Sequence, residues 1–171
     1  MKNNKPDKIK FSGNGFSIIE LLISISLFVI LISISVSIFL KTIRTQKTAL
    51  MLIDAGNNLS LSVEEMAREM RQGINFSGPE NIFGDYIEFT DAATGKRIRY
   101  EINNGALIER VDGVPQQLTS EGVKVTDFEV QLINNPNFPP RVFLNMSVAP
   151  NSDLLQNYKT QIQTTISSRL I

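Results

Sequence analysis

The sequence contains neither cysteine nor histidine among its 171 residues. Without cysteine the chain has no disulfides, thiol nucleophiles or cysteine metal sites. Without histidine it also lacks the Ser-His and Cys-His pairs of common hydrolases and the histidine ligands of many zinc sites. No glycine-rich phosphate loop is present, and Gly95, Gly105 and Gly113 stand in turn contexts instead. We therefore expect a protein that is not an enzyme and that has no cofactor.

Net charge is absent as well, because 17 Lys and Arg residues balance 17 Asp and Glu residues. The first 15 residues hold four lysines and one aspartate, so they carry +3 and the other 156 residues carry −3. Nucleic-acid-binding proteins normally concentrate basic residues on one face. The sequence therefore predicts no nucleic-acid partner.

Acidic residues that could form an acid/base pair or a calcium site are few: Asp85 with Glu88, Asp112, and Asp127 with Glu129. No loop has the alternating Asp/Asn spacing of a dedicated calcium site. We expect these residues to be scattered surface charges, with no bound metal. Whether calcium binds to the part of the chain beyond residue 73 is not decided by the sequence.

A long apolar run is the main feature that the sequence does contain. Residues 16–40 carry a single charge, that of Glu20. As a helix, 25 residues would extend about 37 Å, whereas the hydrocarbon core of a bilayer is about 30 Å thick. The run can therefore cross a membrane. The basic residues before it predict that the leader stays in the cytoplasm and that the rest of the chain lies outside.

Glu20 is costly in such a segment, because a carboxylate in hydrocarbon costs roughly 2.5 to 3.5 kcal/mol on insertion scales. Five positions into the run, it could reach the lipid headgroups as a boundary residue. Alternatively, cleavage after Gly15 would leave a new ammonium on Phe16 about one helical turn from Glu20, or opposite the Glu20 of a neighbouring subunit. Both interpretations remain open at this point.

The junction Gly15-Phe16-Ser17-Ile18-Ile19-Glu20 resembles the processing signal of type IV pilins and type II secretion pseudopilins. The similarity rests on a short basic leader ending in glycine, then Phe, then Glu five positions into the apolar run. It implies cleavage after Gly15 by a membrane-embedded prepilin peptidase and N-methylation of Phe16. It also implies assembly in which Glu20 pairs with the amino terminus of an adjacent subunit.

The same resemblance implies partners and a location. The partners would be other minor and major pilins or pseudopilins and an inner-membrane assembly platform. The protein would be a single-pass inner-membrane protein with its head in the periplasm or outside, and later part of a pilus or pseudopilus. A generic single-pass anchor that carries a receptor or adhesin domain is the alternative, because hydropathy alone does not distinguish the two.

Beyond the membrane run, apolar or small residues recur with helical spacing. They are Ala49, Leu52, Gly56, Leu59, Val63, Met66 and Met70. We expect this stripe to cover a sheet, while Glu64, Glu65, Arg68, Glu69 and Arg71 lie on the opposite face. Glu64 and Arg68 have the i,i+4 spacing of an ion pair, and Gly73 is the expected stop of the helix.

From residue 82 onward the apolar period changes to two, which indicates strands. A hairpin is expected around residues 91–96, and a tight turn at Asn103-Asn104-Gly105 should lead into a third strand over residues 107–111. Residues 123–132, 142–148 and 162–166 also alternate. The sequence thus predicts an α+β fold in which a long N-terminal helix packs on an antiparallel sheet with one covered face.

Four segments follow from these patterns. They are a leader (residues 1–15), a transmembrane or filament-core helix (16–40), an amphipathic helix (41–73) and a β-sheet head (74–171). Residues 61–73, Pro139-Pro140-Arg141-Val142 and residues 164–169 are most similar to J-like pseudopilins and W-like minor pilins, which implies an initiating or capping role. Many major pilins have a proline within the membrane helix, whereas this run has none and Ser37 stands near that place.

Two smaller features each have two interpretations. Phe138 lies between prolines, in residues 134–140, where we expect an irregular loop. It would be either an anchor for a partner or a plug at the end of its own sheet. The serines of the run, at positions 24, 26, 33, 35 and 37, would either mediate helix contacts or face lipid.

Overall fold

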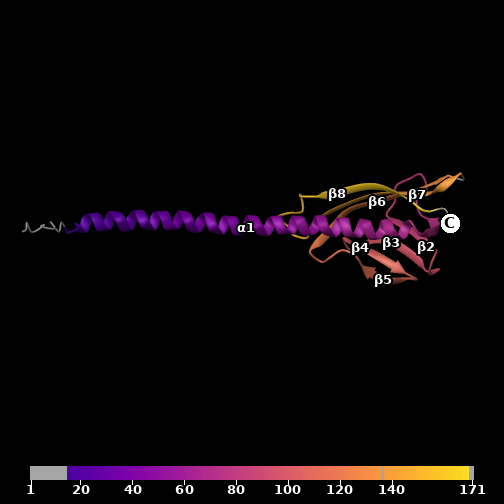
Figure 1. Ribbon diagram of the computed structural model, residues 1–171, viewed down its shortest axis with the longest axis horizontal. Helices are drawn as coiled ribbons and strands as arrows, with labels where there is room; N and C mark the ends of the chain where they lie inside the picture. Colours follow the sequence, from indigo (N-terminus) through magenta and orange to yellow (C-terminus); the bar gives the residue numbers. More distant parts are fainter. Residues whose placement is uncertain (1–14, 136, 170–171) are drawn as a thin grey trace, which may run out of the picture. The chain divides into compact units, whose positions relative to one another are not determined.

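The computed structural model describes residues 15–135 and 137–169. Helix α1, Ile18–Met70, precedes eight strands, which gives the predicted α+β class (Figure 1). The chain divides into two compact units, one ending at Thr45 and one covering Gln46–Ile171, so that α1 contributes to both. Except for Gly15, the predicted leader lies outside the described residues.

The strands form two antiparallel sheets rather than the single sheet that we expected. The first sheet contains, in spatial order, β1 (Gly73–Ser77), β2 (Tyr86–Asp91), β3 (Arg97–Asn103), β4 (Ala106–Val111) and β5 (Val114–Gln117). The second contains β6 (Val123–Asn135), β7 (Phe138–Pro150) and β8 (Thr160–Ser167). Pro115 lies in β5, an edge strand of the first sheet, where a proline is tolerated because only one side of the strand is paired.

The predicted hairpins are confirmed. Thr90 pairs with Arg97 across the β2–β3 turn, where the Asp91 carboxylate accepts hydrogen bonds from the N–H groups of Ala93 and Thr94 at 2.7 and 2.8 Å. In the β3–β4 turn Asn104 and Gly105 have φ values of 51° and 77°. Asn and Gly tolerate this left-handed conformation better than other residues, which is why the sequence signal was reliable.

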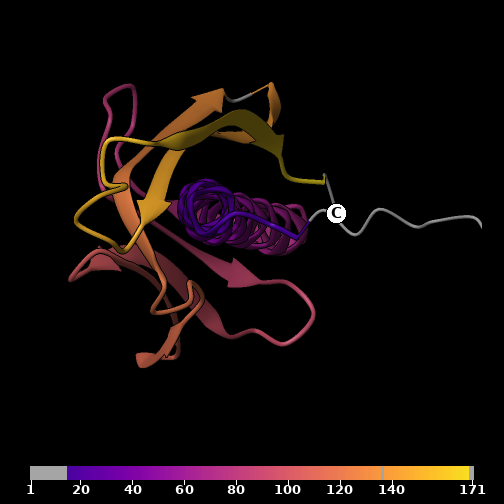
Figure 2. The same ribbon diagram turned by 90° about the vertical axis from the view of Figure 1, so that its left-hand side faces the viewer.

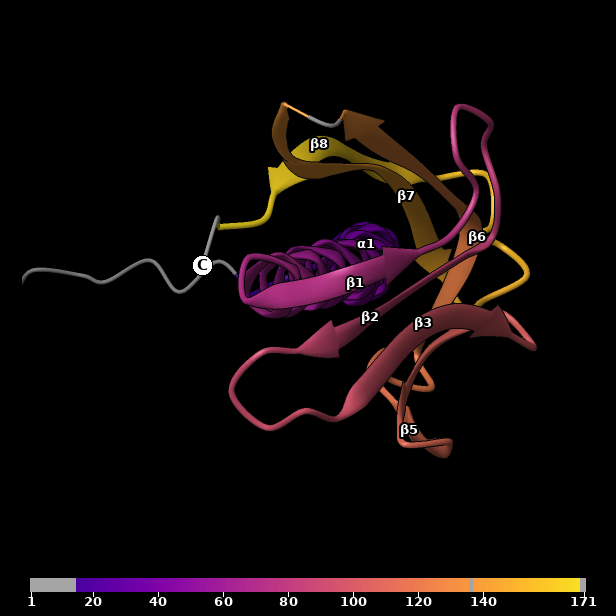
Figure 3. The same ribbon diagram turned by 90° about the vertical axis from the view of Figure 1, so that its right-hand side faces the viewer.

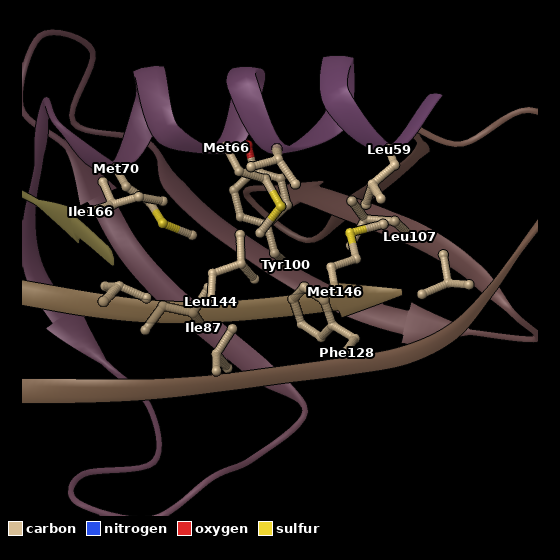
Figure 4. Packing of buried hydrophobic residues seen from close by; sticks show 14 of the residues in the cluster. Leu59, Met66, Met70, Ile87, Tyr100, Leu107, Phe128, Leu144, Met146 and Ile166 are labelled. Atoms are coloured by element: carbon tan, nitrogen blue, oxygen red, sulfur yellow. The ribbon is translucent and has the colours of Figure 1, made fainter. Parts of the chain in front are cut away.

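The core of the head lies between the inner faces of both sheets and the C-terminal part of α1 (Figure 2). Leu59, Met66 and Met70 are fully buried and point at side chains from both sheets, among them Tyr100 and Leu144 (Figure 4). Fully burying such a side chain contributes about 1.5 to 3 kcal/mol.

The predicted stripe therefore covers the sheets over its last four members, from Leu59 to Met70. Further toward the N-terminus of α1 the burial declines: Leu52 and Gly56 are half-buried, and Ala49 is exposed. Ala55 and Ser62 are also buried and widen the face that α1 presents to the sheets. The head thus buries a broader arc of the helix than the seven predicted positions describe.

The end of α1 differs from the prediction. The helix ends at Met70, and Gly73 is the first residue of β1, which passes the end of the helix (Figure 3). A Cβ atom at position 73 would lie only 2.6 Å from the ring of Phe89. Gly73 is therefore required by a close approach to an aromatic ring, not by a helix cap.

The expected ion pair on α1 also has a different partner. Arg68 lies 3.7 Å from Glu65, at i,i+3, rather than pairing with Glu64. Both side chains are well exposed, so the pair contributes only about 0.2 to 0.5 kcal/mol.

The expected loop around Phe138 is a hairpin instead. Asn135 pairs with Phe138, and Pro139 and Pro140 lie within β7. β7 pairs with β8 only from Arg141 onward. Pro139 and Pro140 lie before this point, so they need no N–H group to hydrogen-bond to β8. Phe138 is 56% exposed and stacks under the guanidinium of Arg141 at 5.8 Å. It does not plug the sheet, because more than half of its side chain faces solvent.

Candidate functional site

The junction that the sequence singles out is accessible. Gly15 and Phe16 precede the first residue of α1, and Phe16 is 79% exposed. A Cβ atom added at Gly15 would lie within 4 Å of none of the described residues beyond its neighbours in the chain. The packing of the described residues therefore gives no reason for glycine at position 15.

Glu20 lies in the first turn of α1. The N–H of Leu21 donates to the carbonyl of Ser17 at 3.2 Å, which starts the hydrogen-bond pattern of the helix at this point. A carboxylate in a first turn interacts favourably with the positive end of the helix dipole, typically by 0.3 to 1 kcal/mol. This local benefit is smaller than the cost of placing the charge in hydrocarbon, so Glu20 still needs a partner or an aqueous boundary.

The helix between Glu20 and Lys41 exposes every large apolar side chain. Their exposed fractions range from 46% at Ile32 to 64% at Phe39. The helix is long and apolar enough to span a membrane once, by length and composition. Apolar surface of this extent in water would be strongly unfavourable, so lipid or other protein chains must cover it.

The serines of this helix satisfy their hydroxyl groups locally. Ser26, Ser33, Ser35 and Ser37 each donate to the carbonyl four residues earlier, at 2.8 Å. A hydroxyl that is already hydrogen-bonded costs much less to place in lipid than a free one. These four serines are therefore compatible with lipid, and their small size equally permits close helix contacts.

The structure does not bring the predicted acidic residues together. The Asp112 carboxylate accepts a hydrogen bond from the N–H of Arg97 at 3.0 Å, and that of Glu129 accepts one from the Asn145 amide at 2.9 Å. Glu88 lies 3.5 Å from Arg97. Within the described ranges no group of three acidic, His or Cys side chains could hold a metal ion.

Glu88 belongs to a charged network on the outer face of the first sheet. Its centre is Glu101, which accepts hydrogen bonds from Arg110 at 2.6 Å and from Arg99 at 2.8 Å. The hydrogen bond from Arg110, followed by that from Arg99, holds the pKa of Glu101 below its ordinary value. The network holds neighbouring strands together at the surface.

A second acidic group lies on the inner face of the same sheet, and sequence reasoning missed it. Glu109 of β4 is only 5% exposed and stands directly opposite Tyr100 of β3. The Tyr100 hydroxyl donates to the Glu69 carboxylate at 2.5 Å. Glu69 therefore faces the sheet, not solvent as predicted. Neither Glu69 nor Glu109 forms an ion pair with a described residue.

The two carboxyl groups disfavour a second negative charge. Burial, and then the charge of Glu69, a hydrogen bond to Glu69 and the charge of Glu65, raise the pKa of Glu109 to about 7. Burial and the hydrogen bond to Glu69 also raise the pKa of Tyr100. Protonation of Glu109 removes its charge and so relieves its repulsion with Glu69 and Glu65.

The one sequence signal for this pair is the position of Glu109 in β4. Leu107, Glu109 and Val111 share one strand face by alternation, and Leu107 is an apolar residue on that face. Comparison of the chain with protein-family models, with curated proteins and with solved structures found no match in any of the three.

Proposed function

We propose that this chain is a minor pilin or pseudopilin subunit. It is cleaved after Gly15, N-methylated at Phe16 and assembled through its N-terminal helix, where it initiates or caps a type IV pilus or a type II secretion pseudopilus. Its partners are the prepilin peptidase, other pilins or pseudopilins and an inner-membrane assembly platform. The head faces the periplasm or the outside, and the chain acts without catalysis.

One observation carries the proposal. An accessible glycine precedes an exposed apolar helix whose first turn holds Glu20, the only charged residue between Gly15 and Lys41. A helix that only anchors a domain needs a long apolar segment but no carboxylate at this position. The charge makes membrane insertion less favourable and does not strengthen the anchor. If Glu20 pairs with the amino terminus of a neighbouring subunit, the attraction between the opposite charges offsets the insertion cost of the carboxylate, because this attraction is strong in a medium of low dielectric. The pair also makes the contact between subunits selective.

The first prediction concerns processing. In cells that contain an active prepilin peptidase, the mature chain should begin at Phe16 and carry an N-methyl group. Mass spectrometry of the intact protein and of its N-terminal peptide measures both. As a matched control, Gly15→Val should accumulate as full-length chain, because glycine has no side chain to clash as the backbone enters a protease cleft, whereas valine has a branched one. Recovery of uncleaved wild-type chain only, or cleavage beyond Leu40, would contradict the proposal.

The second prediction separates assembly from anchoring. Glu20→Ala should insert into membranes at least as well as wild type, because it removes a desolvation cost. It should co-purify with partner pilins at least tenfold less, since the charge pair that sets register is lost. Insertion is measured by carbonate extraction and assembly by quantitative co-purification.

Two further variants control this comparison. Glu20→Asp keeps the charge and should retain part of the assembly, whereas Ser24→Ala alters the same helix without touching charge and should behave as wild type. If Glu20→Ala assembles normally, Glu20 is a boundary residue. The single-pass receptor or adhesin with a plain anchor then becomes the better explanation.

A further inference from the structure

Three of the four sheet edges in the head are protected. The outer edge of β6 is covered by residues 78–84, which form backbone hydrogen bonds to Val130 and Leu132 at 2.8 to 3.3 Å. β5 has four residues and contains Pro115. β1 has five residues, an irregular register and a positive φ of 54° at Asn75. Cover, short length, proline and bulges are the usual ways to prevent unwanted strand pairing.

The fourth edge, β8, has none of these protections. It pairs with β7 over eight consecutive residues without a bulge. Its sequence, Thr-Gln-Ile-Gln-Thr-Thr-Ile-Ser, contains no charge, proline or glycine. Among the described residues, no backbone hydrogen bond joins Thr160–Ser167 to anything but β7. A row of free N–H and C=O groups therefore follows this edge.

A groove runs beside this edge, between β8 and α1. Ile162, Thr164 and Ile166 of β8 line one side, and Leu61, Ala67 and Leu118 contribute apolar surface to the rest. Leu61 is 66% exposed although it lies on the helix that forms the core. An added strand would direct every second side chain into this groove. The geometry thus offers both backbone pairing and side-chain pockets, the two components of recognition by strand addition.

The charges at the two ends of β8 indicate which kind of strand could pair with its free edge. Lys159 precedes β8 and Arg169 follows it, and both are exposed. Arg169 and Arg71 line a common pocket, and the N–H of Arg169 donates to the carbonyl of Arg71 at 3.0 Å. Two acidic and two basic residues of α1 also line the groove, Glu64 and Glu65 with Arg68 and Arg71, so their charges sum to zero, and Glu65 is paired with Arg68. The edge is therefore neutral in the middle and basic at each end.

These charges disfavour a second copy of β8 as the occupant. Two copies of β8 could pair as antiparallel strands with Ile162 of one copy opposite Ile166 of the other, so that the two Thr164 residues face each other at the centre. Lys159 of one copy would then stand toward Arg169 of the other at both ends, and like charges facing each other are destabilising. A strand with acidic ends has no such repulsion.

We propose that the β8 edge is a docking site for an extended segment of a different protein, with alternating apolar side chains in its middle and acidic residues at its ends. The segment adds to the second sheet as a fourth strand beside β8. Its apolar side chains enter the groove against α1, and its acidic ends lie near Lys159 and near Arg71 and Arg169. This site is separate from the N-terminal junction and does not depend on the proposed function.

The test uses the full chain in detergent micelles and a fluorescein-labelled synthetic peptide, Glu-Glu-Thr-Val-Thr-Ile-Thr-Val-Thr-Glu-Glu. Fluorescence anisotropy should show saturable binding, and amide hydrogen exchange should show new protection in β8 alone among the strands. A peptide with Lys in place of Glu should bind about tenfold more weakly, the size expected for several exposed ion pairs. A peptide with proline at every second position should not bind, because it cannot pair.

Charge reversal provides the decisive variant. Lys159→Glu combined with Arg169→Glu should invert the preference, so that the Lys-ended peptide binds more tightly than the Glu-ended one. Both side chains are exposed, so the fold should be kept, and Lys124→Glu at another exposed site should leave the preference unchanged. Failure of the Glu-ended peptide to bind, equal binding of the proline peptide, or an unchanged preference in the double variant would each overturn the proposal. So would a dimer of the free chain in which β8 is already protected.

Discussion

Met66→Asp is expected to unfold the head. Met66 is fully buried in a core cluster of hydrophobic residues from α1 and both sheets. An uncompensated buried charge costs about 3 to 5 kcal/mol, a large part of the 5 to 15 kcal/mol that stabilises a typical domain. In a fragment starting at Lys47, the melting temperature by circular dichroism should fall by more than 10 °C, or the transition should disappear.

Leu61→Asp is the matched control, because Leu61 lies on the same helix and is 66% exposed. Its melting temperature should change little. Sedimentation of the same samples tests the alternative in which the helix face is a seam between subunits. In that case the wild-type fragment would self-associate, and Met66→Asp would become monomeric without unfolding. A stable, monomeric Met66→Asp fragment with an unshifted melting temperature would show that the packing argument is wrong.

Glu109→Gln is expected to change how the stability of the head depends on pH. The pKa of Glu109 is about 7 in the folded head and 4.5 by its ordinary value, so the folded state binds its proton more tightly. The stabilisation from this proton is complete below about pH 4.5 and is lost as the pH rises through 7. Each pKa unit corresponds to about 1.4 kcal/mol of stability. Because water near the half-exposed Glu65 weakens its repulsion of Glu109, we expect the free energy of unfolding to fall by only about 2 kcal/mol between pH 5 and pH 8.

Urea unfolding of the head fragment at pH 5, 6.5 and 8 measures this loss. Glu109→Gln should be nearly independent of pH over this range and more stable than wild type at pH 8, since the amide carries no charge. Glu121→Gln, at an exposed loop position, should keep the wild-type slope. A Glu109→Gln head with an unchanged slope would contradict the raised pKa of Glu109. At lower pH the opposite effect sets in, because the pKa values of Asp91 and Glu101 are lowered in the folded head and their stabilisation is lost as they become protonated.

Turn chemistry and strand alternation were reliable guides because both act locally. Asn104 and Gly105 adopt the left-handed conformation that their side chains permit, and β2, β3, β4, β6, β7 and β8 coincide with the alternating segments. The irregular loop predicted at residues 134–140 was wrong for a related reason. Proline excludes a strand only where a neighbour needs its N–H, and whether β8 reaches Pro139 and Pro140 is a tertiary fact.

The inward position of Glu69 illustrates the same limit. At 3.6 residues per turn, Glu69 is about 60° around the helix from Met66. If the helix packed on one flat sheet, a residue at the position of Glu69 would be half exposed to water. A carboxylate at that position therefore predicts a side chain that faces solvent. Here two sheets curve around the helix and bury a wider arc, which brings Glu69 to Tyr100 and Glu109.

The sequence alone determined the features that depend on near neighbours along the chain. These are the 25-residue apolar run with its single charge at Glu20, the α+β class, the helical stripe and the local hairpins, because periodicity and turn residues report directly on backbone conformation. The tertiary structure decided the division into two sheets, the buried position of Glu109 opposite Tyr100, and the choice of β8 as the unprotected edge. Each of these depends on which distant segments lie side by side, and residues such as Glu109 and Thr164 acquire their environment only when those segments meet.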